Sequence, residues 1–412
     1  MTKTDTRMEL LAPAGSFESL RTAVLYGADA VYLGGEMYGL RAKARNFGKE
    51  ELAQAVSFAH QHNVKVYVTV NIIAHNEHLT GIEEYLQYLY EIGVDALIMA
   101  DVGLIQIART TVPNMEIHLS TQASATNYQT FLFWAAQGVK RIVAAREISL
   151  AEMNEIREKI PKDLTIEAFA HGAMCISISG RCLLSTYLSG RDSNLGLCSQ
   201  PCRWSYRLME ETRPGEYFPI SEGEEGTYIF NSKDLCMVEY LPEMQKAGIG
   251  SIKIEGRMKT PLYVAMVTKV YREALDDLAS DPSLYESKKE YYKEQLCMVS
   301  HRDYTPGFYL GKPGTEDQIY SSTSYIKQID FAGKVLRIVG ESILVEQRGK
   351  FLRGDELVLL WQKGDLRPVK ASYIRAEDGT EQESAPHAQQ KVWIPRPEGE
   401  MIPEGTILVR KI

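Results

Sequence analysis

The chain has 412 residues and a formal net charge of −8, with 44% hydrophobic and 24% charged residues. This composition excludes a disordered, collagen-like or coiled-coil chain, and the length predicts two or three domains. The acidic balance argues weakly against a protein whose whole surface binds nucleic acid, but it leaves room for a local basic patch.

Strand-like apolar runs alternate with helix-like segments from residue 8 onward. We expect helices over 16–30, 49–62, 79–93 and 260–279. Near-continuous apolar strands that alternate with helices indicate a parallel sheet covered on both faces, and a count of eight favours an α/β fold with a closed (β/α)₈, TIM-like barrel. An open doubly wound sheet is the alternative, although no GxGxxG follows the first strand and no Walker loop is present. The eight strands are expected at 8–15, 30–35, 65–71, 96–101, 116–121, 141–146, 165–172 and 251–257.

The domain boundaries follow from breaks in this alternation. The barrel is expected over 1–280, and it includes a cysteine-rich loop at 171–207 and an acidic excursion at 208–226. In a barrel, so long a connection lies at the carboxyl ends of the strands, where sites are built. A helical and extended linker is predicted over 281–330. Short alternating runs with turn residues then predict a small antiparallel β-barrel over 331–412.

The first residues contain no apolar segment of signal-peptide length, and no run approaches the about 18 apolar residues of a membrane span. We therefore expect a cytoplasmic protein with no membrane partner. In a reducing compartment, clustered cysteines are more often ligands or catalysts than disulfides.

Four of the six cysteines fall in one glycine-rich stretch: Cys175, Cys182, Cys198 and Cys202. Four thiolates from one bent loop can supply a complete Cys₄ site. The gap between the first two is wide for a zinc hook and suits an iron–sulfur cluster, which is larger than one ion. Zinc and four unrelated buried cysteines remain alternatives. Cys236 is either a substitute ligand or a packed helix residue.

Polar side chains at the ends of the predicted strands would point into a barrel site. Arginine binds carboxylate or phosphate through paired hydrogen bonds, which makes Arg146 and Arg257, and also Arg181 and Arg203 beside the cysteines, candidate anion ligands. The bland alternative is a structural ion pair, such as Arg257 with Glu255. The whole set of strand-end residues is Asn71, Asp101, Ser120, Gln122, Arg146, His171, Glu255 and Arg257.

Two further patterns concern this region. Lys253 and Glu255 alternate along one strand and could face the interior as a buried pair. Between His171 and Arg207 there are four arginines and one aspartate. Together with aromatic residues such as Trp204, this positive island suits a flipped, stacked base.

The stretch EAFAHGAMCISISGRCLLS resembles the signature of the peptidase U32, or collagenase-like, family. Further matches are ELLAPAG, GADAVYLGG, LSTQASATN, AREIS, NSKDL and IKIEGRMKTP, so the resemblance covers nearly the whole chain. The residues that fall at the expected signature positions are Glu167, Phe169, Gly172, Cys175, Gly180, Cys182 and Ser185.

The resemblance is strongest to the branch that hydroxylates tRNA and carries this C-terminal domain. It implies formation of 5-hydroxyuridine at the wobble uridine, dependence on prephenate, and a 4Fe–4S cluster bound by the four clustered cysteines. Cys236 remains an exchange candidate for Cys202, because a shorter relative substitutes a later cysteine. The implied partners are tRNA and a related U32-family chain, without DNA. Prephenate or phosphate would be held by Asn71, Gln122, Arg146, Arg181, Arg203 and Arg257, and Glu255 or His171 would move a proton.

Two other functions compete with this one: a collagenase-like peptidase and a non-catalytic iron–sulfur partner protein. A peptidase needs an activated nucleophile, a zinc-bound water or a carboxylate pair. The chain has no HExxH, no GxSxG and no cysteine-protease signature. Ser177, Ser179 and Ser185 flank the cysteines, and the sequence assigns them no base. His171, the nearby histidine, is as well explained by structural hydrogen bonds.

Overall fold

The computed structural model describes residues 7–39, 46–175, 177, 182, 184–191, 193, 197–203, 205–206, 222–223, 226–228, 233–312, 325–397 and 401–412. These residues form two compact units. One comprises the described residues of Met1–Leu20, Asp29–Lys259 and His301–Tyr325, and the other comprises those of Arg21–Ala28, Thr260–Ser300 and Ile326–Ile412. The boundaries 1–280, 281–330 and 331–412 stay predictions.

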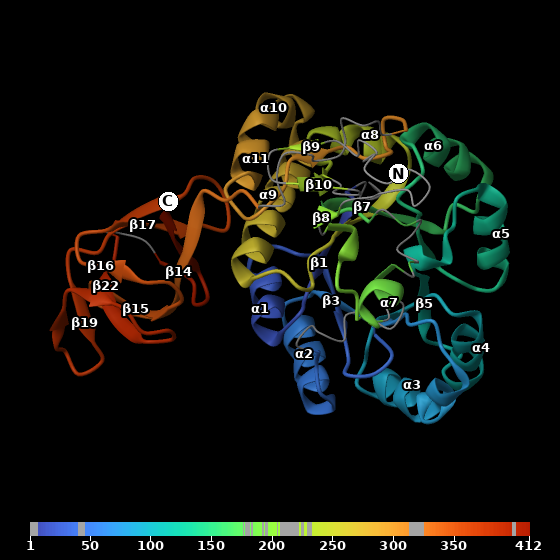
Figure 1. Ribbon diagram of the computed structural model, residues 1–412, viewed down its shortest axis with the longest axis horizontal. Coiled ribbons are helices and arrows are strands. Elements are labelled where there is room, and N and C mark those ends of the chain that lie inside the picture. Colours follow the sequence, from blue (N-terminus) through green and yellow to red (C-terminus); the bar gives the residue numbers. More distant parts are fainter. Residues whose placement is uncertain are drawn as a thin grey trace, which may run out of the picture. The chain divides into compact units, whose positions relative to one another are not determined.

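The first unit is built on eight parallel strands that close into a ring. Each strand pairs with the next in chain order, and the last pairs with both the seventh and the first, which confirms the predicted TIM-like barrel. Figure 1 shows helices α2 to α6 around these strands. The strands are β1 (Glu9–Pro13), β2 (Ala30–Gly34), β3 (Lys65–Val70), β4 (Ala96–Met99), β5 (Glu116–Leu119), β6 (Arg141–Val143), β7 (Thr165–Ala173) and β12 (Ile249–Ile254).

Side chains cap the first amides of α4, α5 and α6. Asp101 accepts a hydrogen bond from the Leu104 amide at 3.0 Å, and Ser149 forms a capping box with Glu152. The helices are α1 (Phe17–Leu25), α2 (Lys49–Gln61), α3 (Ile82–Glu91), α4 (Val102–Thr111), α5 (Tyr128–Ala136), α6 (Leu150–Lys159), α7 (Leu184–Ser189) and α8 (Leu241–Lys246). The 3₁₀ turns are η1 (Asn76–Leu79), η2 (Thr121–Ala123), η5 (Pro201–Arg203) and η6 (Val238–Tyr240).

Short strands extend the barrel unit. Strand β11 (Asp234–Cys236) pairs antiparallel with β7, and β13 (Tyr304–Thr305) pairs parallel with β11. A separate small sheet joins β8 (Ser205–Tyr206), β10 (Gly226–Tyr228) and β9 (Glu222–Gly223). Most of the predicted acidic excursion at 208–226 lies outside the described residues. No helix in the described ranges is both long enough and apolar enough to cross a bilayer.

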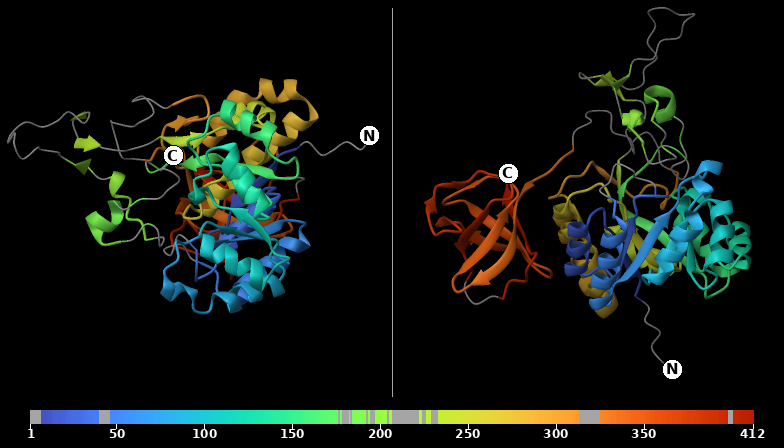
Figure 2. Two further views of the ribbon diagram at one scale, coloured as in Figure 1. Left: turned by 90° about the vertical axis from the view of Figure 1, so that its right-hand side faces the viewer. Right: turned by 90° about the horizontal axis from the view of Figure 1, so that it is seen from below.

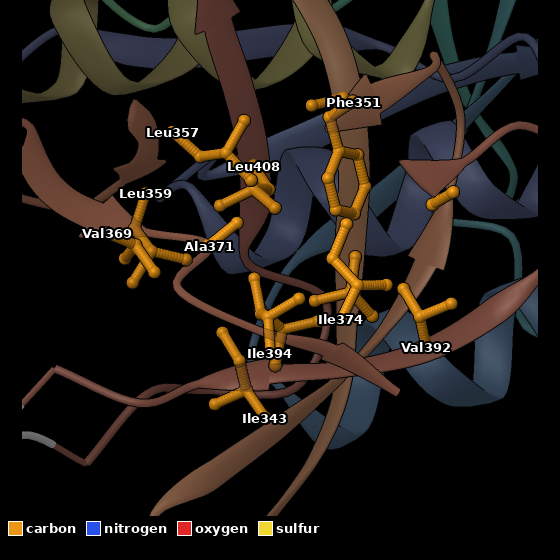
Figure 3. Close-up of a cluster of buried hydrophobic side chains, with 14 of the residues drawn as sticks. Ile343, Phe351, Leu357, Leu359, Val369, Ala371, Ile374, Val392, Ile394 and Leu408 are labelled. Carbon is orange, nitrogen blue, oxygen red and sulfur yellow. The ribbon is translucent and has the colours of Figure 1, made fainter. Parts of the chain in front are cut away.

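The second unit contains three helices, α9 (Pro261–Ser280), α10 (Pro282–Ser287) and α11 (Lys289–Leu296), and an antiparallel sheet of eight strands. The sheet curls around its own core (Figure 2), which confirms the predicted small β domain. Buried side chains such as Ile343, Phe351 and Leu408 fill that core (Figure 3). In sheet order the strands are β18 (Arg367–Lys370), β17 (Glu356–Leu360), β23 (Ile407–Lys411), β14 (Ile329–Val339), β15 (Ser342–Gln347), β22 (Lys391–Pro395), β19 (Ile374–Ala376) and β20 (Glu381–Gln382). The short strands β16 (Phe351–Leu352) and β21 (Ser384–Ala385) pair with each other.

Candidate functional site

A cavity of about 190 Å³ lies at the carboxyl ends of the barrel strands. This is the end of a TIM-like barrel where active sites are built. Its lining joins the strand ends to the cysteine-rich loop. The lining residues are Tyr32, Thr69, Asn71, Ile98, Ser120, Thr121, Gln122, Val143, Arg146, Phe169, Cys175, Cys182, Leu184, Ser193, Cys198, Pro201, Cys202, Lys253, Glu255 and Arg257.

The fold therefore brings most of the sequence-predicted site residues to one place. All four clustered cysteines line the cavity. Six of the strand-end candidates join them there: Asn71, Ser120, Gln122, Arg146, Glu255 and Arg257. These residues lie as much as 186 positions apart in the chain, from Asn71 to Arg257, and the closing of the barrel is what unites them.

Other candidates lie elsewhere. Asp101 caps α4 and also accepts from the Ala74 amide at 3.3 Å. His171 and Cys236 are buried opposite each other on β7 and β11, and neither is among the described residues that line the cavity. Cys236 thus ends a strand, and the alternative that placed it in a helix was wrong. Arg181, Trp204 and the Arg203 side chain lie outside what the structure describes.

Hydrogen bonds fix the loop segments that carry the thiols. The Leu184 amide donates to Sγ of Cys182, and the Gln200 amide donates to Sγ of Cys198, both at 3.3 Å. Amide donors of this kind stabilise thiolates and tune bound clusters. All six cysteines are thiols in the described part of the chain. Within that same part, no three His, Cys, Asp or Glu side chains are grouped so as to hold a metal ion.

A serine network ties α7 to the segment around Cys198. The Ser199 amide donates to Oγ of Ser185 at 2.9 Å, and the hydroxyl of Ser199 lies 2.6 Å from that of Ser189. Ser185 also has its Oγ 3.0 Å from the Ser199 hydroxyl. The Ser185 hydroxyl is thus engaged by another serine, which explains it as a structural residue.

Arg257 is set into the cavity wall by two glycines and a threonine. Its side chain is only 6% exposed, and Nη1 donates to Oγ1 of Thr69 at 3.0 Å. A Cβ on Gly34 would lie 2.3 Å from that Nη1, and a Cβ on Gly15 would lie 1.8 Å from the Arg257 carbonyl oxygen. The glycines of the ELLAPAG and AVYLGG segments therefore leave the space that Arg257 occupies.

The guanidinium group of Arg146 lies over an aromatic ring that also lines the cavity. Its guanidinium carbon is 4.0 Å from the centre of the Phe169 ring, and Nη1 donates to the Ala173 carbonyl at 2.8 Å. Its Nε is buried and has no hydrogen-bond partner within the described ranges. A guanidinium held on a ring face keeps its charge while its position is fixed.

Lys253 reaches the cavity from inside the barrel, where its ion-pair partner is Glu167. Nζ lies 3.0 Å from Oε1 of Glu167, whose other oxygen lies 3.0 Å from Nη1 of Arg141. Arg141 also forms an ion pair with Glu9, so positive and negative side chains alternate through the barrel interior. Burial alone would raise the pKa of Glu167, but the charges of Lys253 and Arg141 lower it to about 2. Strand alternation predicted Lys253 and Glu255 as a buried pair. Lys253 is buried as expected, but its ion-pair partner is Glu167, and Glu255 is only half-buried.

His171 is a neutral imidazole within the wall between β7 and β11. Burial, together with the charges of Lys259 and His301, lowers its pKa to about 3. Its ring centre lies 5.3 Å from that of Tyr304. These contacts match the structural alternative for this residue, since its ring is not among the described groups that line the cavity.

Comparison with known proteins identifies the family. The Peptidase family U32 pattern matches residues 15–319, and the Peptidase family U32 C-terminal domain matches residues 327–408. The chain belongs to peptidase family U32.

Three relatives bear on function. The chain is 43% identical to tRNA hydroxylation protein P1 of Bacillus subtilis (strain 168), over 93% of this chain and 90% of that protein. It is 37% identical to tRNA hydroxylation protein P of Escherichia coli (strain K12), over 95% and 94%. It is also 37% identical to the 23S rRNA 5-hydroxycytidine C2501 synthase of the same strain, over 68% of this chain and 41% of that protein.

Proposed function

We propose that this protein hydroxylates RNA and forms 5-hydroxyuridine at the wobble uridine of tRNA. The observation that carries the proposal is the cavity, which gathers four thiols, three cationic side chains and an amide pair at the carboxyl ends of the barrel strands. Relatives named as tRNA hydroxylation proteins, at 37% and 43% identity over most of this chain, support the substrate class.

We further propose that the four cavity cysteines hold a 4Fe–4S cluster. Four cysteines are the donor set that such a cluster takes, and amide donors already contact two of these sulfurs. The cluster would supply one-electron chemistry at the cavity. Cys202 lines the cavity and Cys236 does not, which supports Cys202 as the fourth ligand.

The cations of the cavity suit a co-substrate with carboxylates, which we propose is prephenate. Arg146, Arg257 and Lys253 line the cavity together with Glu255, the one carboxylate among the described lining residues. Lys253 is already paired with Glu167, so the two arginines supply the excess of positive charge. Thr69 and Phe169 hold the two guanidinium groups in place, so little side-chain entropy is lost when a carboxylate binds. Glu255 is then the group placed to accept or donate a proton.

The function is tested with nucleosides from tRNA. A bacterial strain without its own 5-hydroxyuridine-forming proteins is complemented with this chain, and its tRNA is digested and analysed by mass spectrometry. We expect 5-hydroxyuridine or nucleosides made from it to return, and to be lost again when prephenate synthesis is blocked. Complemented cells with no such nucleoside would contradict the proposal.

The cluster is tested by chemical analysis of protein purified without oxygen. We expect about four iron and four sulfide per chain in the wild type and in Cys297→Ala, which lies outside the cavity lining, and a marked loss in Cys175→Ala. A colourless protein with stoichiometric zinc would overturn the cluster assignment.

A further inference from the structure

One residue of the amide pair in the cavity is held in a fixed orientation. Gln122 lies in the turn η2 directly after β5, lines the cavity, and is only 5% exposed. Backbone hydrogen bonds fix this turn, because the Ser120 amide donates to the Met99 carbonyl at 2.7 Å and the Ala123 amide donates to the Ser120 carbonyl at 3.0 Å. Gln122 is therefore part of a rigid wall.

The orientation of the Gln122 amide is set by two donors. Nδ2 of Asn71 donates to Oε1 of Gln122 at 2.8 Å, and the Ser120 hydroxyl donates to the same oxygen at 3.3 Å. With both donors on Oε1, the amide nitrogen is the end that remains for a ligand. Nε2 of Gln122 has no hydrogen-bond partner within the described residues. The side chain therefore offers the cavity hydrogen-bond donors and no acceptor.

We propose that Gln122 recognises the C4 oxygen of a uracil base and so makes the cavity select uridine over cytidine. This inference rests on the proposed function and names the residue that reads the base. A pyrimidine with a keto group at C4 presents an acceptor there, whereas cytosine presents an amino donor. Nε2 of Gln122 can donate to the C4 oxygen of uracil. With cytosine it would instead face the C4 amino group, which is also a donor.

The cavity volume and the family relationships support a residue that recognises the base. A cavity of about 190 Å³ is smaller than the roughly 300–1,000 Å³ of sites for drug-sized ligands, so it suits one ring extruded from the RNA. The named relatives include a 5-hydroxycytidine synthase, so this family contains proteins that act on cytidine. A member that modifies uridine then needs a group that rejects the cytosine amino group.

The test exchanges the donor for an acceptor. In Gln122→Glu, Asn71 and Ser120 can still donate to one carboxylate oxygen, and the second oxygen accepts from the cytosine amino group. Gln122→Met removes both the hydrogen-bond donor and the acceptor and keeps a side chain of similar size. Gln137→Glu, at an exposed position at the end of α5, introduces the same charge away from the cavity.

Holoprotein purified without oxygen is given prephenate and anticodon stem-loops that carry uridine or cytidine at the target position, and both binding and hydroxylation are measured. We expect wild type and Gln137→Glu to prefer uridine by roughly ten- to a hundredfold. Gln122→Met should lose most of this preference, and Gln122→Glu should reverse it. An unchanged uridine-to-cytidine ratio in Gln122→Glu with normal iron content would overturn the inference. If wild type binds uridine RNA selectively and hydroxylates neither substrate, base recognition stands and the proposed function fails.

Discussion

Replacing Glu167 by glutamine tests the charge network that holds Lys253 at the cavity. Glu167 is fully buried, and its carboxylate contacts Lys253 and Arg141 at 3.0 Å each. The amide keeps the shape but removes the negative charge, so two buried cations lose a counter-charge. Breaking a buried pair by removing one partner costs about 3–5 kcal/mol. Because Glu9 still neutralises Arg141, we expect the lower end, about 3 kcal/mol.

That loss is large enough to measure by thermal unfolding. At about 2–4 °C per kcal/mol for a domain of this size, the midpoint should fall by roughly 6–12 °C. The control is Asp163→Asn, which removes the partner of Lys140 from an ion pair whose Asp163 side chain is 77% exposed, and should cost at most about 1 kcal/mol. If Glu167→Gln melts within a degree or two of that control, the network does not stabilise the barrel as argued.

The same substitution should weaken binding of a carboxylate ligand. Burial lowers the pKa of Lys253, and Glu167 opposes that shift. Without Glu167 the pKa of Lys253 falls further, so the ammonium form is less favoured, and calorimetry should show weaker binding of prephenate.

Buried titratable groups, one strained glycine and one cavity arginine each give the protein a measurable response. Folding lowers the pKa of His171 from about 6.5 to about 3 and that of Glu167 from about 4.5 to about 2. As the pH falls, the unfolded chain therefore binds a proton at each of these residues at a higher pH than the folded chain does. Urea denaturation should therefore show stability falling as the pH drops below about 6.5, and falling further below about 4.5 as Glu167 adds its share. A flat profile from pH 6.5 down to pH 4 would be inconsistent with the burial of His171. Gly172→Ala should lower stability by more than about 2 kcal/mol, because φ is +114° and the new Cβ would lie 2.7 Å from the Glu255 carbonyl oxygen. Gly379→Ala, with φ +89° and nothing within 4 Å, is the control for backbone strain alone in the same melting experiment. Arg257→Lys keeps the charge but loses the planar fork, so prephenate affinity by calorimetry should fall roughly tenfold, and equal affinity would remove Arg257 from the binding site.

The eight barrel strands were predictable because each is a buried apolar run bounded by turn residues, and strand order follows chain order in this fold. The position of Asp101 also had a local signal, since an aspartate between a strand and an apolar helix is a typical N-cap. His171 was placed at a strand end, but β7 extends to Ala173 and β11 covers it.

Long-range partners were not predictable in the same way. Alternation placed Lys253 inside the barrel, but its partner Glu167 lies 86 residues away on a neighbouring strand. The roles of Gly15 and Gly34 depend on the path of Arg257, more than 220 residues later, and Gln122 gained its orientation only when β3 and β5 brought Asn71 and Ser120 to it. Such contacts form only when the barrel closes, so no local sequence pattern predicts them.

The central claim is that the cavity cysteines support hydroxylation of tRNA. Its most direct test is mass spectrometry of tRNA nucleosides from a strain that lacks its own 5-hydroxyuridine-forming proteins, complemented with wild type, Cys175→Ala or Cys297→Ala at matched protein levels. We predict 5-hydroxyuridine-derived nucleosides with wild type and with Cys297→Ala, and their loss with Cys175→Ala. Equal amounts with both cysteine variants would contradict the claim.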